Sequence, residues 1–130
     1  MKSEIEVKDI MYGILKGSDL EDAVTGAIYK DQRPLNSDQE DIVISVLASS
    51  TSQVQTFTLN VNVYVKDIKR GDEYIENTKR LRTLATACFE PLATGCSNGH
   101  RYQLVSQNIL KCSDIAFHCI NNRIELQIHS

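Results

Sequence analysis

One stretch of this chain alternates apolar and polar side chains over ten residues, and it constrains the fold more than any other feature. The apolar set is Phe57, Leu59, Val61, Val63 and Val65, and the polar set is Thr56, Thr58, Asn60, Asn62 and Tyr64. Successive side chains of a β-strand point to opposite faces, so this period of two predicts a strand with one buried face. The chain therefore has to build a sheet and cover one side of it.

Two further strand signals precede this stretch. Residues 40–47 read EDIVISVL, with apolar side chains on both faces. A polar turn at Ser49–Ser52 separates them from the alternating strand, so the two segments are expected to form an antiparallel hairpin. Earlier, Gly26–Tyr29 is a half-strand that is followed by Arg33 and Pro34. Because proline cannot donate a ladder hydrogen bond, we expect a short edge strand that leads into an exposed loop.

Helix signals flank these strands. Ser3 and Glu6 have the spacing of a capping box, and an amphipathic pattern after them predicts a first helix over residues 4–16. A second box of the same spacing predicts a short helical turn at Asp19–Val24. After the alternating strand, the charged loop KDIKRGD leads to a long helix over about Tyr74–Leu92, for which Asp72 is the expected N-cap.

The last third of the chain predicts a second hairpin. Tyr102–Leu110 has the composition of a strand, and apolar residues alternate on both sides of Asn121–Asn122. Asparagine tolerates the positive φ that a two-residue turn requires. A turn there would pair the apolar residues of 115–119 with those of 124–128 on one face, which would fix the register.

This order of elements predicts one α+β domain that spans residues 1–130. Strands in runs that are separated by a helix favour a mainly antiparallel sheet, with two main helices packed on one face. A chain of 130 residues can bury a core of its own without disulfides or metals.

Composition excludes several classes of function. The formal net charge is -3, whereas a general nucleic-acid-binding protein is normally basic, so sequence-specific or general binding to nucleic acid is not expected. No apolar run reaches the roughly 18 residues of a membrane span, and the N-terminus lacks the apolar core of a signal peptide. We therefore expect a protein that is kept in a reducing cytoplasm.

The sequence predicts no catalytic residue, no cofactor and no metal site. The nucleotide-binding, zinc-protease and serine-hydrolase motifs are absent. The histidines are expected to be solvated, with His118 and His129 on outer strand faces and His100 in a turn. None of the four cysteines has the close paired spacing of a zinc site; they are expected to be small buried hydrophobes rather than metal ligands or disulfides.

The polar row of the alternating strand has two interpretations. It is either a solvated sheet face of good β-propensity or a surface that meets another subunit. Tyrosine and asparagine suit the second role, because they make contacts without the desolvation cost of a charge.

In the order of its elements the chain resembles the tail terminator and tail completion proteins of long-tailed bacteriophages, the group related to the lambda tail terminator. Members of this family often have a helix, a short helical turn, a G-x-I-Y strand and then a proline, which here are matched by Gly26–Tyr29 and Pro34. An apolar strand and a long alternating strand follow, ending in a V-Y-V pattern before a charged loop, as at Val63–Val65. The resemblance covers nearly the whole chain.

The resemblance implies a structural virion protein without enzymatic activity. Such proteins form a ring, usually a hexamer, that caps the tail tube, ends its polymerisation and helps to join it to the head. The implied partners are further copies of the chain, the tail tube protein and the head–tail connector protein. The implied locations are the bacterial host cytoplasm during assembly, for a phage or a prophage, and then the virion tail.

Exposure and charge give first candidates for the contact between subunits. The residues are Arg33, Asp67, Lys69, Arg70, Asp72, Glu73, Lys79, Arg80 and Arg82. One alternative function is a free-standing α+β binding domain that dimerises through its sheet. Another is a small cysteine-dependent enzyme, which would need one thiol of low pKa.

Overall fold

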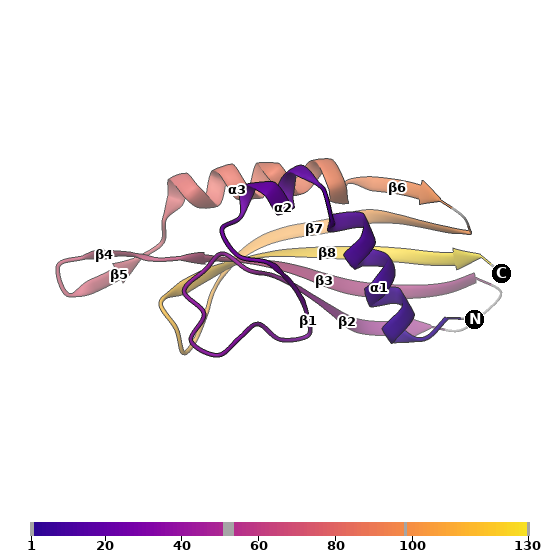
Figure 1. The fold of residues 1–130 in the computed structure, drawn as a ribbon, viewed down its shortest axis with the longest axis horizontal. Helices are drawn as coiled ribbons and strands as arrows, with labels where there is room; N and C mark the ends of the chain where they lie inside the picture. Colours follow the sequence, from indigo (N-terminus) through magenta and orange to yellow (C-terminus); the bar gives the residue numbers. More distant parts are fainter. Residues whose placement is uncertain (1, 51–53, 98, 130) are drawn as a thin grey trace.

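The computed structural model describes residues 2–50, 54–97 and 99–129. Within these ranges six strands form one sheet in the order β1-β2-β3-β8-β7-β6, and three helices lie on one of its faces (Figure 1). The strands are β1 (Ile28–Lys30), β2 (Ile42–Ser50), β3 (Val54–Lys66), β6 (Thr94–Ser97), β7 (His100–Lys111) and β8 (Phe117–His129). The helices are α1 (Glu4–Leu15), α2 (Asp19–Ala23) and α3 (Thr78–Leu92). The α+β class is as predicted.

The alternating stretch is β3, which lies inside the sheet between β2 and β8. Its inward row from Phe57 to Val65 is buried, while the outward row is only half-buried. β2 pairs with it in antiparallel fashion, as predicted, with Ile42 opposite Val63. Ser49 and Ser50, predicted to begin a turn, continue β2, and residues 51–53 of that turn lie outside the described ranges.

The helices cover the inward row of β3. The predicted capping box starts α1, since the Ser3 side chain accepts from the Glu6 N–H and the Glu6 side chain accepts from the Ser3 N–H. The α1 residues Val7, Met11 and Leu15 are fully buried. α3 adds a second apolar stripe, consisting of Leu81, Leu84, Cys88 and Leu92. No helix in the described ranges is long and apolar enough to cross a membrane.

The long helix starts later than predicted. It begins at Thr78, and Asn77 rather than Asp72 is its N-cap, with its side chain accepting from the Arg80 N–H. The preceding residues instead form a two-stranded antiparallel hairpin, β4 (Ile68–Arg70) and β5 (Glu73–Ile75). The hairpin forms in place of the predicted helix start because Gly71 takes a positive φ of 61°, which turns the chain back on itself.

The sequence predicts a mainly antiparallel sheet, but the sheet is mixed. β1 is the expected short edge strand, but it pairs with β2 in parallel, with Ile28 opposite Ile42. Parallel neighbours need a long connection, because the chain must return to the same end of the sheet before it starts the next strand. Residues 31–41 make that return as a loop without a helix.

A close approach explains the glycine before β1. The Gly26 N–H donates to the Glu40 carbonyl oxygen at 3.0 Å, so the chain segments on either side of the loop touch here. A Cβ at Gly26 would stand 2.1 Å from Oδ1 of Asp41. No larger residue fits without a shift of the loop.

The predicted hairpin at Asn121–Asn122 is wrong. β8 runs straight through both asparagines and pairs with β3 on one side and β7 on the other. In a continuous strand the two apolar runs face opposite ways. Ile124 therefore points to the helices, and Cys119 points to the other face.

Hydrogen bonds explain why these asparagines sit inside a strand. Asn122 is fully buried under α3, and its side-chain amide donates to the Val61 carbonyl at 3.1 Å and to the Cys88 sulfur at 3.3 Å. Its Oδ1 accepts from Nε2 of Gln107 at 2.9 Å. On the other face the Asn121 amide donates to Oδ1 of Asn62 at 2.7 Å. Both amides are satisfied by the sheet, so neither is needed to turn the chain.

Replacing Asn122 by alanine should destabilise the protein. Val61 and Gln107 would lose a partner inside the core, which costs roughly 1–3 kcal/mol. The measurement is urea unfolding followed by circular dichroism. Asn108→Ala, at an exposed position of the neighbouring β7, is the matched control and should stay within about 0.5 kcal/mol of wild type. Equal stability of the two variants would contradict the buried network.

Candidate assembly interface

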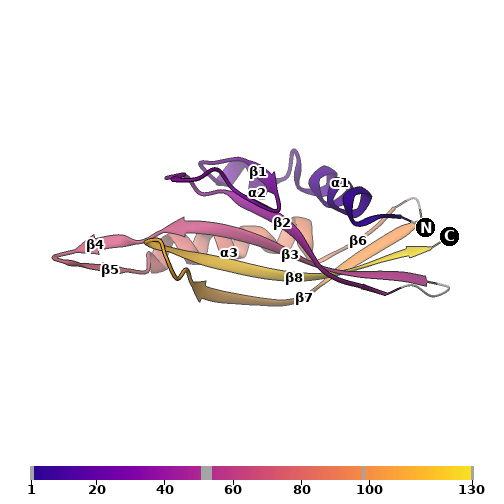
Figure 2. The same ribbon diagram turned by 90° about the horizontal axis from the view of Figure 1, so that it is seen from below.

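The β4–β5 hairpin, here called the arm, projects from one end of the body (Figures 1 and 2). Every side chain of its tip and flanks from Ile68 to Tyr74 is exposed, and none of them joins the core that the described residues form. The arm carries four of the predicted interface residues, namely Lys69, Arg70, Asp72 and Glu73. All four are available to a partner molecule.

The root of the arm is fixed to the body by a buried pair. Oδ1 of Asp67 lies 2.6 Å from Nδ1 of His118, and their side chains are 2% and 15% exposed. The Asp67 N–H also donates to the Ala116 carbonyl oxygen at 2.9 Å. Asp67, predicted at a subunit interface, thus already has partners inside its own subunit. His118, predicted to be solvated, lies on the helix-covered face beside it, because β8 has no turn at residue 121.

Arg33 fastens the loop of residues 31–41 onto the face of the sheet that the helices leave open. Its guanidinium carbon lies 4.6 Å from the centre of the Tyr64 ring and 4.5 Å from that of Phe117. Its Nε lies 2.9 Å from Oδ2 of Asp41, whose side chain is 1% exposed. Cation–π contacts and a desolvated ion pair therefore converge on one side chain. Arg33, too, is engaged within the subunit.

The three predicted cations of α3 differ in their surroundings. Arg80 donates to both oxygens of the Glu40 carboxylate at 2.7 Å and to the Ala23 carbonyl oxygen, so it ties the helix to the N-terminal segments. The hydrogen bond with Glu40 raises the pKa of Arg80 further. Lys79 and Arg82 are exposed. Their role in a subunit contact, like that of the arm residues, stays a prediction.

The polar row of β3 lies on the sheet face opposite the helices. Its members from Thr56 to Tyr64 are half-buried, and Asn60 and Asn62 accept hydrogen bonds from Asn121. This cross-strand amide cluster is itself uncharged, and Arg123 and Glu125 lie opposite Asn60 and Thr58 on the same face. Such a face suits contact with another protein, and that contact remains a prediction.

No site for small-molecule chemistry stands out in the described ranges. No group of three or more His, Cys, Asp or Glu side chains there could hold a metal ion. A hollow of about 380 Å³ lies by β6, and its lining includes Cys96, Arg101, Gln103, Glu125 and Gln127. Arg101 donates to Gln127 within it at 2.9 Å. The hollow is therefore lined mainly by polar groups of the sheet surface.

The cysteines fall into two classes. Burial raises the pKa of Cys88 to about 11 and that of Cys119 to about 12, and it also raises the pKa of Cys112. These three thiols are protonated at neutral pH and are poor nucleophiles. Cys96, on the edge strand β6, is exposed, contrary to the expectation that the cysteines are buried.

Two features of the candidate interface escaped sequence reasoning. The sequence predicts a charged loop where the arm lies, although Ile68 and Tyr74–Ile75 flank the turn residues Gly71–Asp72 as hairpin strands do. The exposed apolar residues at the end of β7 were also missed. They look like core residues in the sequence, and only the order of strands reveals that they lie at an edge.

Arg33→Ala should destabilise the fold strongly. It would leave the Asp41 carboxylate buried without its cation and uncover the Phe117 ring, and removing one partner of a buried ion pair costs roughly 3–5 kcal/mol. Thermal unfolding and urea titration measure the change. Lys79→Ala removes an exposed cation for which the described residues offer no acid, and it should change stability by less than about 0.5 kcal/mol. An Arg33 variant as stable as this control would show that the contacts of Arg33 do not hold the loop.

Alkylation of the folded protein at neutral pH should label Cys96 first. Burial and raised pKa values protect Cys88 and Cys119, so both should react only after unfolding in denaturant. Peptide mass spectrometry after timed treatment with iodoacetamide measures the order. Fast labelling of a buried thiol in the native state would instead point to an activated cysteine.

The structure was compared with known proteins. No known family model matches the sequence, and no curated protein is similar to it at a significant level. The fold resembles that of a solved chain described as "Virion of native gene transfer agent (GTA) particle", with a TM-score of 0.59 and 13% sequence identity. The match covers 92% of this chain and 92% of that chain. The chain therefore shares, over nearly its whole length, the fold of a chain from a gene transfer agent virion.

Proposed function

We propose that this chain is a structural virion protein, a tail terminator that forms a ring on the head-proximal end of a phage-type tail tube. In this role it ends tube polymerisation, contributes to head–tail joining and performs no catalysis. The ring is a hexamer of identical subunits, which meets the tail tube protein on one side and the head connector on the other.

The shared fold is the observation that carries this proposal. A chain of a gene transfer agent virion has the same fold, and the match covers 92% of both chains. The order of elements from α1 to β8 also agrees with the terminator resemblance of the sequence. Fold alone does not specify a role, so the position in the particle is the part that needs the experiment.

The surface of the subunit is suited to assembly. Ten large hydrophobic side chains are exposed among the described residues, including Tyr74 in the arm, Phe89 on α3 and Leu110 on β7. Clustered exposed apolar residues mark interaction sites more often than chance. The hollow near β6, by contrast, is neither enclosed nor mainly apolar, as a pocket for a small molecule would be. Subunits of a ring meet through two different patches, so a projecting arm and a separate receiving surface fit this geometry.

Purified protein added to growing tubes of the cognate tail tube protein should form a ring at one end of each tube and stop its elongation. Negative-stain electron microscopy measures the ends and the lengths, with tube protein alone as the control. Deletion of the gene in the producing strain should give overlong tubes and unjoined heads. Tubes of normal length and normal joining after deletion would overturn the terminator role.

The alternative is a free-standing binding domain that dimerises through the polar face of β3. Native mass spectrometry over a wide concentration range separates the two. A sixfold species favours the terminator, while a strict dimer that never forms rings and never binds tubes favours the binding domain.

A further inference from the structure

We propose that the arm of one copy adds as an extra strand to the free edge of β7 in the next copy, with β5 as the pairing strand. The inference deepens the proposed function and rests on it, since it names the two surfaces that join neighbouring subunits in the ring. It assigns the arm to a second copy of this chain rather than to the tube or the head.

The receiving edge is the second half of β7. β6 pairs with β7 only from His100 to Gln103, and β7 continues to Lys111 with β8 on its other side. In the part of the chain that the structure describes, no strand pairs with residues 105–111 on the outer side. Unpaired N–H and C=O groups along such an edge are a template for another strand.

The side chains of this edge are unusually apolar for a free strand. The last four residues of β7 are all exposed, including Ile109 at 43% and Leu110 at 51%. Charged residues, bulges or short length normally protect sheet edges from pairing with other chains. β7 has a bulge at Val105, but beyond it the edge runs on to Lys111, which is the one charged residue among residues 105–111. The edge therefore has the properties of a pairing site.

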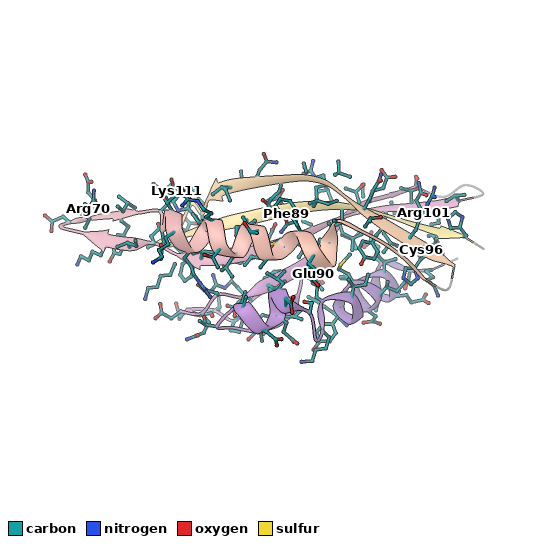
Figure 3. The ribbon with its side chains drawn as sticks, turned by 90° about the horizontal axis from the view of Figure 1, so that it is seen from above. Arg70, Phe89, Glu90, Cys96, Arg101 and Lys111 are labelled. Carbon is teal, nitrogen blue, oxygen red and sulfur yellow. The ribbon has the colours of Figure 1, made fainter. Side chains whose placement is uncertain are left out.

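The helix beside the edge completes the receiving surface. Gln107 donates to the Ala85 carbonyl oxygen at 3.0 Å, so this face of α3 lies along β7. Arg82 and Phe89 are spaced three and four residues from Ala85 and share its face of the helix. Figure 3 shows Phe89 and Lys111 on the β7 side of α3, with Glu90 on the side of α1 and α2. The surface of Arg82, Phe89, Ile109 and Lys111 is here called the edge patch.

The arm offers an unpaired strand and exposed apolar side chains to the edge patch. Its two strands pair only with each other, and an isolated two-stranded hairpin is marginally stable in water. Tyr74 is 53% exposed and Ile68 is 45% exposed, so the arm presents apolar side chains that its own subunit does not cover. A third strand would bury them and would satisfy one open edge of the hairpin.

Charge selects the strand that pairs. β4 is basic, with Lys69 and Arg70, whereas β5 starts at Glu73 and is followed by Glu76. The edge patch is basic through Arg82 and Lys111. Among the described residues neither these two cations nor the two glutamates have an ion-pair partner within 4.0 Å. Opposite charges across an interface favour the correct register, and like charges oppose the wrong one, so β5 rather than β4 faces β7.

The contact is heterologous, because an arm on one copy meets a different patch on the next. Repeating one such contact closes a ring when the rotation between copies divides a full turn. Each subunit then gives one arm and receives one. Pairing of two arms in a twofold dimer would instead leave both edge patches open.

A charge exchange tests this contact. Arg82→Glu with Lys111→Glu makes the patch acidic, and Glu73→Lys with Glu76→Lys makes the arm basic. In each double variant alone, the arm and the edge patch carry charges of the same sign. Each should therefore assemble roughly a hundredfold more weakly than wild type. Mixed in equal amounts, the two variants should restore the oligomer, since every arm then meets a patch of opposite charge in an alternating ring. Native mass spectrometry measures both effects and the composition of the mixed species.

The control is Arg101→Glu with Arg123→Glu, which changes two exposed cations outside the patch by the same total charge. Circular dichroism should show that all three double variants fold like wild type. Variants that assemble normally on their own, a mixture without rescue, or a wild-type chain that stays monomeric would each overturn the arm–edge contact. If the wild type caps tubes but the mixture of variants does not assemble, the arm–edge contact is wrong and the proposed function stands. If the mixture assembles but the wild type does not cap tubes, the arm–edge contact stands and the terminator function is wrong.

Discussion

The pairing of β3 with β8 is the constraint on which the rest of the structure depends. The two strands are matched residue for residue from Val54 opposite His129 to Lys66 opposite Phe117. Their inward sides form one apolar surface, and α1 and α3 exist as stable helices because that surface buries their apolar stripes. Most helical stability in proteins comes from such packing rather than from propensity. A shift of one residue between β3 and β8 would turn that surface away from the helices.

The opposite face is organised by polar interactions. Arg33 closes the long loop over one end of it, and the amide cluster around Asn121 occupies its middle. A desolvated ion pair is a weak source of net stability, but a misplaced loop would leave Asp41 buried without a partner. The contacts of Arg33 therefore determine where the loop lies more than they add to the stability of the fold. In this way a crossover without a helix still returns the chain to the correct end of the sheet.

Sequence reasoning succeeded where one local signal decides the structure. The period of two identified β3, the Ser3–Glu6 box identified the start of α1, and the short run ending at Tyr29 and followed by Pro34 marked an edge strand. It failed where a long-range partner decides. Asn121–Asn122 has the chemistry of a turn, and hydrogen bonds with β3 and β7 keep it extended. The direction of β1, the hairpin around Gly71 and the free edge of β7 likewise follow from which strands become neighbours, which no short window of sequence encodes.

The position of β8 has a consequence for synthesis. β8 lies at the centre of the sheet and follows every other described strand in the sequence, so β3 leaves the ribosome long before its main partner exists. Until then the nascent chain holds an apolar strand, β3, whose edge toward β8 is open. Contacts of such long sequence separation form slowly, and unpaired strands are prone to association with other chains. The central pairing of the sheet therefore cannot form until β8 has been made, and the interval before that is when β3 is most open to pairing with another chain.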